Sequence, residues 1–264
     1  MTKEFRPHVR YFGHGLRAAL AIHCTLGHSG AWRGVGDALG DRLRLVAIDL
    51  PGHGKSARWD GENDLHQLCT DAALSQLSEP MDVIGHSFGA TIALRLAVEH
   101  PQLVRSLTLI EPVFIAAAIA DAPERVKAHE VEAEPYFTAL QSGDEMRAAR
   151  LFNRFWGDGT KWDDIPCTTR QYMADRMHLV PGQSPAIIDD EPGLLAKGAL
   201  GRAHMPCLLI QGEHTADVID AIHQSLAARL PNARRVTISG AGHMSPISHP
   251  AAVAAEISEL LEVT

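Results

Sequence analysis

Short apolar runs alternate along the first half of the chain with segments in which apolar residues recur at helical spacing. The apolar runs occupy residues 17–22, 43–48, 81–84 and 103–110. Helical spacing is found over residues 34–39, 65–77 and 90–97. Because strands that alternate with helices are joined by crossover connections, this order predicts a mostly parallel central sheet covered by helices on both faces.

The same alternation resumes near the end of the chain, with runs at 207–210 and 236–238 on either side of a helical segment at about 219–230. The stretch between about 113 and 201 has a different pattern, rich in helix formers and broken at 157–159 and 181–185. There we predict helices over 124–140, 144–156 and 168–179. The expected organisation is an α/β core formed by residues 1–112 and 202–264, interrupted by a helical cap at 113–201.

The cap carries apolar and aromatic side chains that either line an acyl pocket or pack between the cap and the sheet. Packing is the usual role of residues at helical spacing. The apolar run at 116–118 is too short to anchor the chain in a membrane and suggests a pocket wall or a hinge. The candidate lining residues are Phe114, Tyr136, Phe137, Phe152, Phe155, Trp156, Met173 and Met177.

A Gly-x-Ser-x-Gly pentapeptide, residues 85–89, stands between a predicted strand and a predicted helix. A serine on so sharp a turn adopts a strained backbone conformation, which requires small residues next to it. The turn exposes the Ser87 hydroxyl and directs the first N–H groups of the helix toward the group that the hydroxyl attacks. The alternative is a glycine-rich turn without chemistry, and the pentapeptide alone does not decide between the two.

Three further landmarks agree with the pentapeptide in order and spacing. They are the turn at 23–27, the Asp-Leu-Pro-Gly-His-Gly-Lys-Ser loop at 49–56, and Gly-Ala-Gly-His at 240–243. Together they make the chain resemble an α/β-hydrolase fold protein throughout. The resemblance implies that Ser87 is the nucleophile and His243 the general base, with the N–H groups of Thr25 and Phe88 forming the oxyanion hole. Chemistry favours the same pair, because a serine hydroxyl is a poor nucleophile until an imidazole takes its proton.

The third member of the triad is ambiguous. Most relatives of this fold keep the acid in a Gly-x-x-Asp turn after the second-to-last strand, but Thr215 stands at that position here. Threonine cannot carry the charge that orients the imidazole, so Glu111, Asp217 or Glu213 must serve. We favour Glu111, which ends the strand after the Ser87 helix, where haloalkane dehalogenase-like branches of the family keep their acid. The plain alternatives are a hinge residue before the cap for Glu111 and a helix N-cap for Asp217.

Composition limits the classes of partner and the cellular compartment that we expect for this protein. The net charge is −8, from 24 basic and 32 acidic residues without a basic stripe, which argues against a nucleic-acid partner. The four cysteines are scattered, and the amino terminus, with Lys3 and Glu4, lacks an apolar signal core. No apolar stretch is long enough for a membrane helix. A cytoplasmic protein with reduced thiols is therefore expected.

No cofactor or metal is expected. The 15 histidines include no H-E-x-x-H motif or comparable cluster, and serine chemistry needs no metal. The Gly54-Lys55-Ser56 sequence is not a phosphate-binding loop, because Asp49 stands where that loop needs its first glycine.

The expected function is a serine hydrolase that cleaves an ester, a lactone or a similar small-molecule carbonyl substrate through an acyl-enzyme on Ser87. Serine in place of aspartate disfavours dehalogenase and epoxide hydrolase chemistry. A carbon–carbon bond hydrolase, a non-hydrolytic lyase or perhydrolase, and a ligand-binding receptor stay open as alternatives, because one fold supports many functions. The substrate itself and the oligomeric state are not readable from the sequence.

Overall fold

The computed structural model describes residues 5–264, so the charges of Lys3 and Glu4 lie outside it. Its core is a seven-stranded sheet in the order β1-β3-β2-β4-β5-β6-β7, in which only β1 runs antiparallel to its neighbour. The predicted fold class is confirmed. The strands are β1 (Val9–Phe12), β2 (Ala18–Ile22), β3 (Arg44–Ile48), β4 (Met81–His86), β5 (Val104–Ile110), β6 (Cys207–Gly212) and β7 (Ala233–Ile238).

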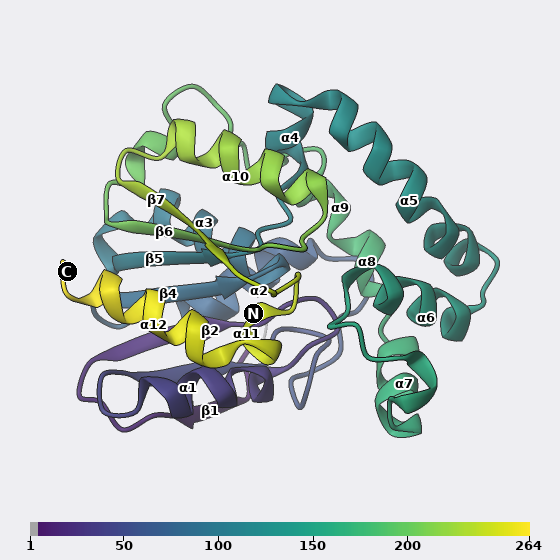
Figure 1. The fold of residues 1–264 in the computed structure, drawn as a ribbon, viewed down its shortest axis with the longest axis horizontal. Helices are drawn as coiled ribbons and strands as arrows, with labels where there is room; N and C mark the ends of the chain where they lie inside the picture. The colour runs from purple at the N-terminus through teal and green to yellow at the C-terminus, as the bar shows by residue number, and fades with distance from the viewer. Residues whose placement is uncertain (1–4) are drawn as a thin grey trace.

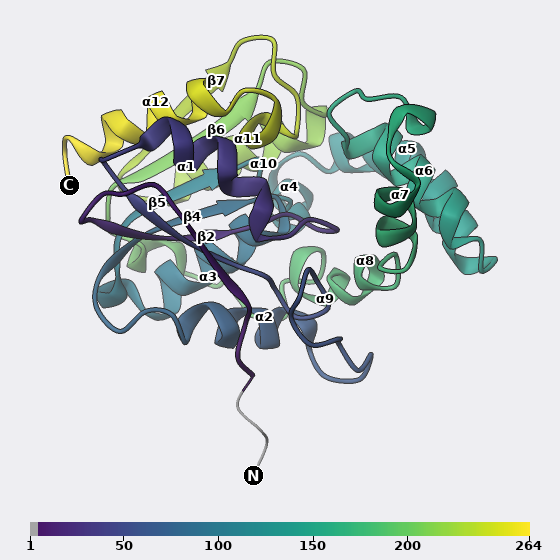
Figure 2. The same cartoon turned by 90° about the horizontal axis from the view of Figure 1, so that it is seen from below.

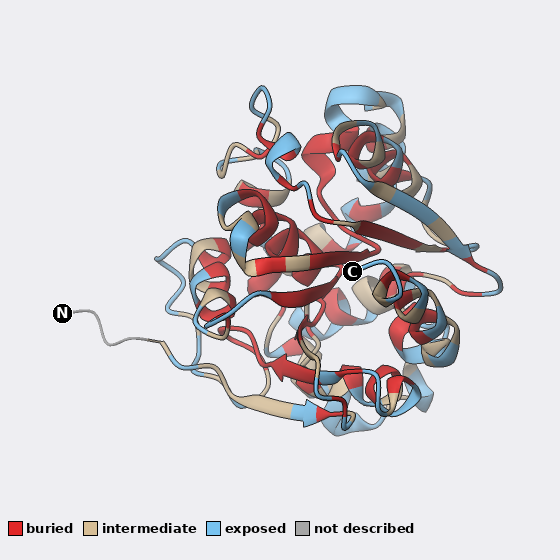
Figure 3. Cartoon of the chain, turned by 90° about the vertical axis from the view of Figure 1, so that its left-hand side faces the viewer, coloured by how far each residue is buried: buried red, intermediate tan, exposed pale blue. Residues whose placement is uncertain are grey.

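The middle of the sheet is buried on both faces. Leu20 of β2 lies between Val46 of β3 and Val83 of β4, and the interior strands are almost continuously apolar for this reason. Figure 3 shows these strands buried, while exposure is confined largely to the outer sides of the helices and to loops.

Helices cover each face of the sheet with a separate apolar cluster. One face is covered by α1 (Arg33–Leu39) and α12 (Pro250–Leu261), as Figure 2 shows. The other is covered by α2 (Leu65–Leu74), α3 (Phe88–Glu99) and α10 (Asp217–Arg229). Helix α3 is buried at every residue from Phe88 to Val98, and apart from Thr91 and Arg95 these residues are apolar or glycine.

Six helices lie between β5 and β6, and the helices α5, α6 and α7 extend beyond one end of the sheet (Figure 1). One predicted element needs correction, because the helix expected over 168–179 ends at Ala174. The apolar run at 116–118, for which no element is predicted from the sequence, is part of a helix that packs on α10. The six are α4 (Ile115–Asp121), α5 (Pro123–Gln141), α6 (Glu145–Trp156), α7 (Cys167–Ala174), α8 (Leu179–Gly182) and α9 (Ser184–Ile187).

Short helical turns complete the chain at η1 (Ser29–Trp32), η2 (Pro101–Leu103), η3 (Trp162–Asp164), η4 (Leu200–Arg202) and α11 (Ser245–Ser248). The division into a core and a cap at residues 113–201 stays a prediction, because α4 at the start of that stretch packs on the core helix α10. Within residues 5–264, no helix combines the length and the apolar character that crossing a bilayer requires.

Candidate active site

Ser87 lies at the turn between β4 and α3, with φ 56° and ψ −118°. The turn leaves no room for side chains on either side. A Cβ atom on Gly85 would lie 2.4 Å from the carbonyl oxygen of Gly89, and one on Gly89 would lie 2.3 Å from that of Ile22. The two glycines of the pentapeptide are therefore steric requirements of this turn.

Three of the four non-glycine residues with positive φ in residues 5–264 lie in turns that follow strands of the sheet next to one another. They are Leu26 (φ 59°), Ser87 (φ 56°) and Glu111 (φ 51°), which follow β2, β4 and β5. Such conformations cost about 1–3 kcal/mol each, and they cluster at functional sites. The strain in this protein is thus concentrated at the carboxyl ends of the central strands, where sheets of this kind bind ligands.

Glu111 and His243 form a buried pair. The His243 Nδ1 atom lies 3.1 Å from Glu111 Oε2, and the main-chain N–H of Gly212 donates to Glu111 Oε1 at 2.6 Å. The Thr215 hydroxyl donates to Oε2 as well. With Nδ1–H directed at the carboxylate, Nε2 of a neutral His243 ring is left as the proton acceptor.

The charge state of Glu111 follows from these contacts. Burial by itself raises the pKa of this carboxyl group, but hydrogen bonding to His243, Thr215 and Gly212 and the charge of the imidazole outweigh it and hold the pKa below its usual value. Glu111 is therefore a carboxylate at neutral pH even though it is fully buried. Such a group can hold one imidazole tautomer and stabilise the imidazolium.

The two other candidate acids are elsewhere. Asp217 is the first residue of α10, its side chain is 72% exposed, and its Oδ2 atom lies 3.4 Å from Nε of Arg125. Glu213 accepts hydrogen bonds from Ser239 Oγ and from the N–H of Gly240, each at 2.8 Å. Asp217 thus occupies the first turn of a helix, where a carboxylate is favoured by the helix dipole, and the structure does not bring it to His243.

The expected oxyanion donors have no competing acceptors within residues 5–264. Phe88 is the first residue of α3, and neither its N–H nor that of Thr25 donates a hydrogen bond to another group there. The Thr25 hydroxyl donates to Oε1 of Gln183, at 2.9 Å, which ties this turn to the segment between α8 and α9. Gln183 had no signal in the sequence, since its partner lies 158 residues away.

Histidines brace the loops around this site. His86 donates from Nε2 to the carbonyl oxygen of His243 at 2.9 Å, and His23 accepts at Nε2 from the N–H of Leu50 at 3.0 Å. Burial lowers the pKa of His86 to about 3 and that of His23 to about 4, so both rings are neutral. The neighbouring Cys24 is buried, which raises the pKa of its thiol to about 12 and leaves it unreactive.

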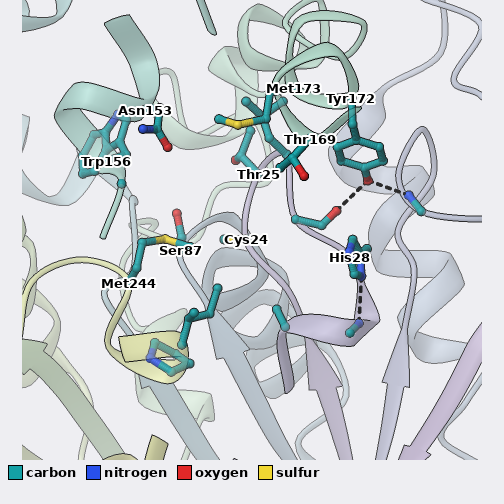
Figure 4. A pocket seen from close by; sticks show the side chains of 18 of the residues that line it. Cys24, Thr25, His28, Ser87, Asn153, Trp156, Thr169, Tyr172, Met173 and Met244 are labelled. Carbon is teal, nitrogen blue, oxygen red and sulfur yellow. Dashed lines mark hydrogen bonds between the residues drawn. The ribbon is translucent and has the colours of Figure 1, made fainter. Parts of the chain in front are cut away.

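Two cavities meet at Ser87. The larger, about 700 Å³, also contains His243, and the smaller, about 310 Å³, lies under α5 and α9. Both are lined by Thr25, Ser87 and two aromatic residues of α6, Phe152 and Trp156. Figure 4 shows Ser87 on the same side of the pocket as Trp156 and Met244.

The candidate lining residues divide between these cavities and the core. Tyr136, Phe137, Phe152 and Trp156 line the smaller cavity, and Met173 lines the larger. Phe114 and Met177 are fully buried in apolar clusters, and Phe155 lines neither of these two cavities. Trp156 also packs against His243, with the ring centroids 4.6 Å apart.

The sequence profile of the alpha/beta hydrolase family matches residues 19–256, which is most of the chain. The chain belongs to the alpha/beta hydrolase family. Its relatives include a pimeloyl-[acyl-carrier protein] methyl ester esterase of Nitrosomonas europaea, 26% identical over 249 residues that cover 92% of this chain and 94% of that protein. An esterase of the same name from Xanthomonas campestris pv. campestris is 29% identical over 255 residues, 94% of this chain and 95% of the relative.

Solved structures agree with this membership. The enol-lactonase from Burkholderia xenovorans LB400 superimposes with a TM-score of 0.74 at 18% identity, covering 97% of this chain and 96% of that one. A hydrolase from Pseudomonas aeruginosa PA01 gives a TM-score of 0.74 at 22% identity, with coverages of 96% and 93%. These likenesses show the fold. Family and relatives together identify the protein as an alpha/beta-fold hydrolase.

Proposed function

We propose that this hydrolase cleaves carboxylic esters through an acyl-enzyme on Ser87, with His243 as the general base and Glu111 as the acid of the triad. The observation that carries the proposal is the 3.1 Å contact between His243 Nδ1 and a fully buried, ionised Glu111, at a cavity that also contains the strained Ser87. An imidazole held this way is suited to taking a proton from a serine hydroxyl.

The reaction runs in two halves. Ser87 Oγ attacks the ester carbonyl carbon while His243 Nε2 accepts its proton, and the N–H groups of Thr25 and Phe88 stabilise the oxyanion. The tetrahedral intermediate collapses, the carbon–oxygen bond to the leaving group breaks, and the imidazolium protonates the departing alcohol. Water then attacks the acyl-enzyme with the same imidazole as base and releases the carboxylic acid.

The two cavities suit the two arms of an ester. His243 must protonate the leaving group, so the cavity that His243 lines receives the alcohol and the incoming water. The smaller cavity, which His243 does not line, receives the acyl arm. Its walls are mostly apolar, with Val126, Ala133 and Phe137 among them, and its volume suits a short or medium acyl chain.

The relatives support an ester over other carbonyl substrates, because the two described above are named methyl ester esterases. A cytoplasmic location is our further inference. It is supported by the four cysteines, none of which is in a disulfide bond in residues 5–264, since disulfides form mainly in oxidising compartments.

Steady-state hydrolysis of p-nitrophenyl butyrate by the wild-type protein and by Ser87→Ala tests the proposal. The wild-type protein should turn over many times, with an initial burst of p-nitrophenol where deacylation is slow, and Ser87→Ala should lose the activity while keeping the wild-type circular dichroism spectrum. Undiminished hydrolysis by folded Ser87→Ala would overturn the acyl-enzyme. Tight binding of a ligand without turnover of any ester would instead favour a ligand-binding receptor.

A further inference from the structure

The larger cavity carries positive charge and no carboxylate in its lining. Arg10, on β1, and Lys55, in the loop after β3, line it, and neither Asp nor Glu does. The chain as a whole has a net charge of −8, so this is a local departure from its average. The smaller cavity has the opposite charge, because Glu130 and Glu134 line it and neither Arg nor Lys does. The two cavities therefore differ in the sign of their charge.

Neither cation forms an ion pair with a carboxylate of residues 5–264. The side chains of Arg10 and Lys55 form no ion pair or hydrogen bond there, although Arg10 is half-buried. Arg17 and Arg105, in contrast, both contact the buried carboxylate of Asp82. A partly desolvated guanidinium without a counter-charge is costly, and an anionic ligand would remove that cost.

His28 adds a neutral donor beside Arg10. Its Nδ1 atom accepts a hydrogen bond from the N–H of Gly30 at 2.9 Å, so the proton of the neutral ring is on Nε2. Burial and the charges of Arg10 and Arg176 lower the pKa of His28, although Asp49 opposes them. A Cβ atom on Gly30 would lie 2.5 Å from His28 Cε1 and 2.9 Å from a guanidinium nitrogen of Arg10. Gly30 therefore allows these two side chains to approach the same point.

This group lies away from the nucleophile. Figure 4 shows His28 and Tyr172 at one side of the cavity and Ser87 with Met244 and Trp156 at the other. The Tyr172 hydroxyl is already engaged, since it donates to the carbonyl oxygen of Gly27 and accepts from the N–H of Gly54. A ligand that reaches both ends of the cavity must consequently be extended, with its reacting carbonyl at Ser87 and a second group near His28.

Building on the proposed function, we infer that the leaving group of the natural ester carries an anionic group, a carboxylate or a phosphate, which is bound by Arg10, Lys55 and the neutral donor His28. The assignment to the leaving group follows from His243, which lines the same cavity and has to protonate the departing oxygen. Charge-assisted hydrogen bonds are the strongest that such a site can offer, and an arginine can hold either anion with two parallel bonds. The acyl arm is a poorer candidate for this role, because the glutamates that line the smaller cavity would repel an anion.

A set of butyrate esters that differ only at the remote end of the leaving group tests this inference. The leaving groups are 4-hydroxyphenylacetate, its phosphonate analogue 4-hydroxybenzylphosphonate, and the neutral 4-hydroxyphenylacetamide, with kcat/KM measured for each by chromatography of the released phenol. We expect the wild-type protein to prefer at least one anionic ester over the neutral one by about tenfold or more. The anionic ester with the higher kcat/KM identifies the anion as a carboxylate or a phosphoryl group.

Variants assign the preference to the named cations. In Arg10→Gln and in Lys55→Gln the ratio of anionic to neutral kcat/KM should fall toward one, and in the charge-matched control Arg58→Gln, an exposed residue outside the cavity, it should stay at the wild-type value. Equal rates for the anionic and neutral esters in the wild-type protein would overturn the inference and leave ester hydrolysis intact. Absence of hydrolysis of every ester in the set would instead contradict the proposed function.

Discussion

The hydroxyl group of Thr215 donates a hydrogen bond to Glu111 Oε2, the same carboxylate oxygen that lies 3.1 Å from His243 Nδ1. Thr215 follows β6 at the position where the resemblance to the family expects the acid, whereas Glu111 follows the neighbouring strand β5. The usual acid position thus supports a carboxylate supplied by the adjacent strand. We infer that Thr215 positions Glu111 and keeps it ionised.

Thr215→Val should lower kcat by about tenfold and change KM little. The substitution keeps the shape of the side chain but removes one donor from a buried carboxylate, and hydrogen bonds to charged groups contribute about 1.5–3 kcal/mol. Without this hydrogen bond Glu111 stabilises the His243 imidazolium less well in the transition state, and kcat falls for this reason. Thr215→Ser retains a hydroxyl and is the matched control. Wild-type kcat in Thr215→Val would show that the hydrogen bond has no part in the reaction.

Tyr172 is predicted to hold α7 to the loops beside the site. Its hydroxyl donates to the Gly27 carbonyl at 2.9 Å and accepts from the Gly54 N–H at 2.8 Å. Tyr172→Phe leaves both groups without this partner, which should lower the free energy of unfolding by about 1–3 kcal/mol and raise KM, because Tyr172 lines the larger cavity. Urea unfolding measures the first effect. Tyr11→Phe, at a residue 62% exposed, should change neither quantity, and an equal loss in both variants would refute the bridging role.

The stability of the fold should fall as the pH drops below about 6.5. Burial lowers the pKa of seven histidines below its ordinary value, so the unfolded chain takes up protons that the folded chain does not, and each histidine contributes a slope of about 1.4 kcal/mol per pH unit between its two pKa values. The stabilisation is complete above the unfolded pKa and is lost as the pH falls toward the folded one. The seven are His23, His129 and His223, with a pKa of about 4 each, His66 and His86, with a pKa of about 3 each, and His28 and His53.

Urea unfolding at pH 7.5, 6.5, 5.5 and 5 checks this pH dependence. His223 offers a specific variant, because it is fully buried in α10 and neither ring nitrogen has a hydrogen-bond partner in residues 5–264. His223→Leu should flatten the dependence below pH 6.5 by up to about 1.4 kcal/mol per unit. A free energy of unfolding that is constant from pH 7.5 to 5 in the wild-type protein would contradict the account.

Most of the fold could be predicted because its strands are buried on both faces and therefore read as apolar runs. The edge strand β1 could not, since its four residues Val9–Phe12 include an exposed Tyr11 and an arginine and form no such run. Helix α4 was not predicted from the sequence either, for the opposite reason. Its residues Ile115–Ala118 are all buried, so no polar face marks the helical period.

The site was readable as far as local chain geometry determines it. Ser87 and Glu111 each follow a strand directly, so the order of elements places both at one edge of the sheet. The division into two cavities was not readable, because it depends on where α6 lies over Ser87 and on which of its aromatic side chains face inward. Phe155 and Trp156 are adjacent in sequence, yet only Trp156 lines the cavities at Ser87.

The identity of the triad is tested most directly by the rate at which a serine-directed fluorophosphonate labels the protein, with the adduct located by peptide mass mapping. The account predicts a single adduct on Ser87 that forms about 10²–10⁴-fold more slowly in Glu111→Gln, because the imidazole loses the charge that orients it, and at the wild-type rate in Asp217→Asn. Slow labelling in Asp217→Asn with normal labelling in Glu111→Gln would reverse the assignment of the acid. The absence of any Ser87 adduct on folded wild-type protein would contradict the catalytic serine itself.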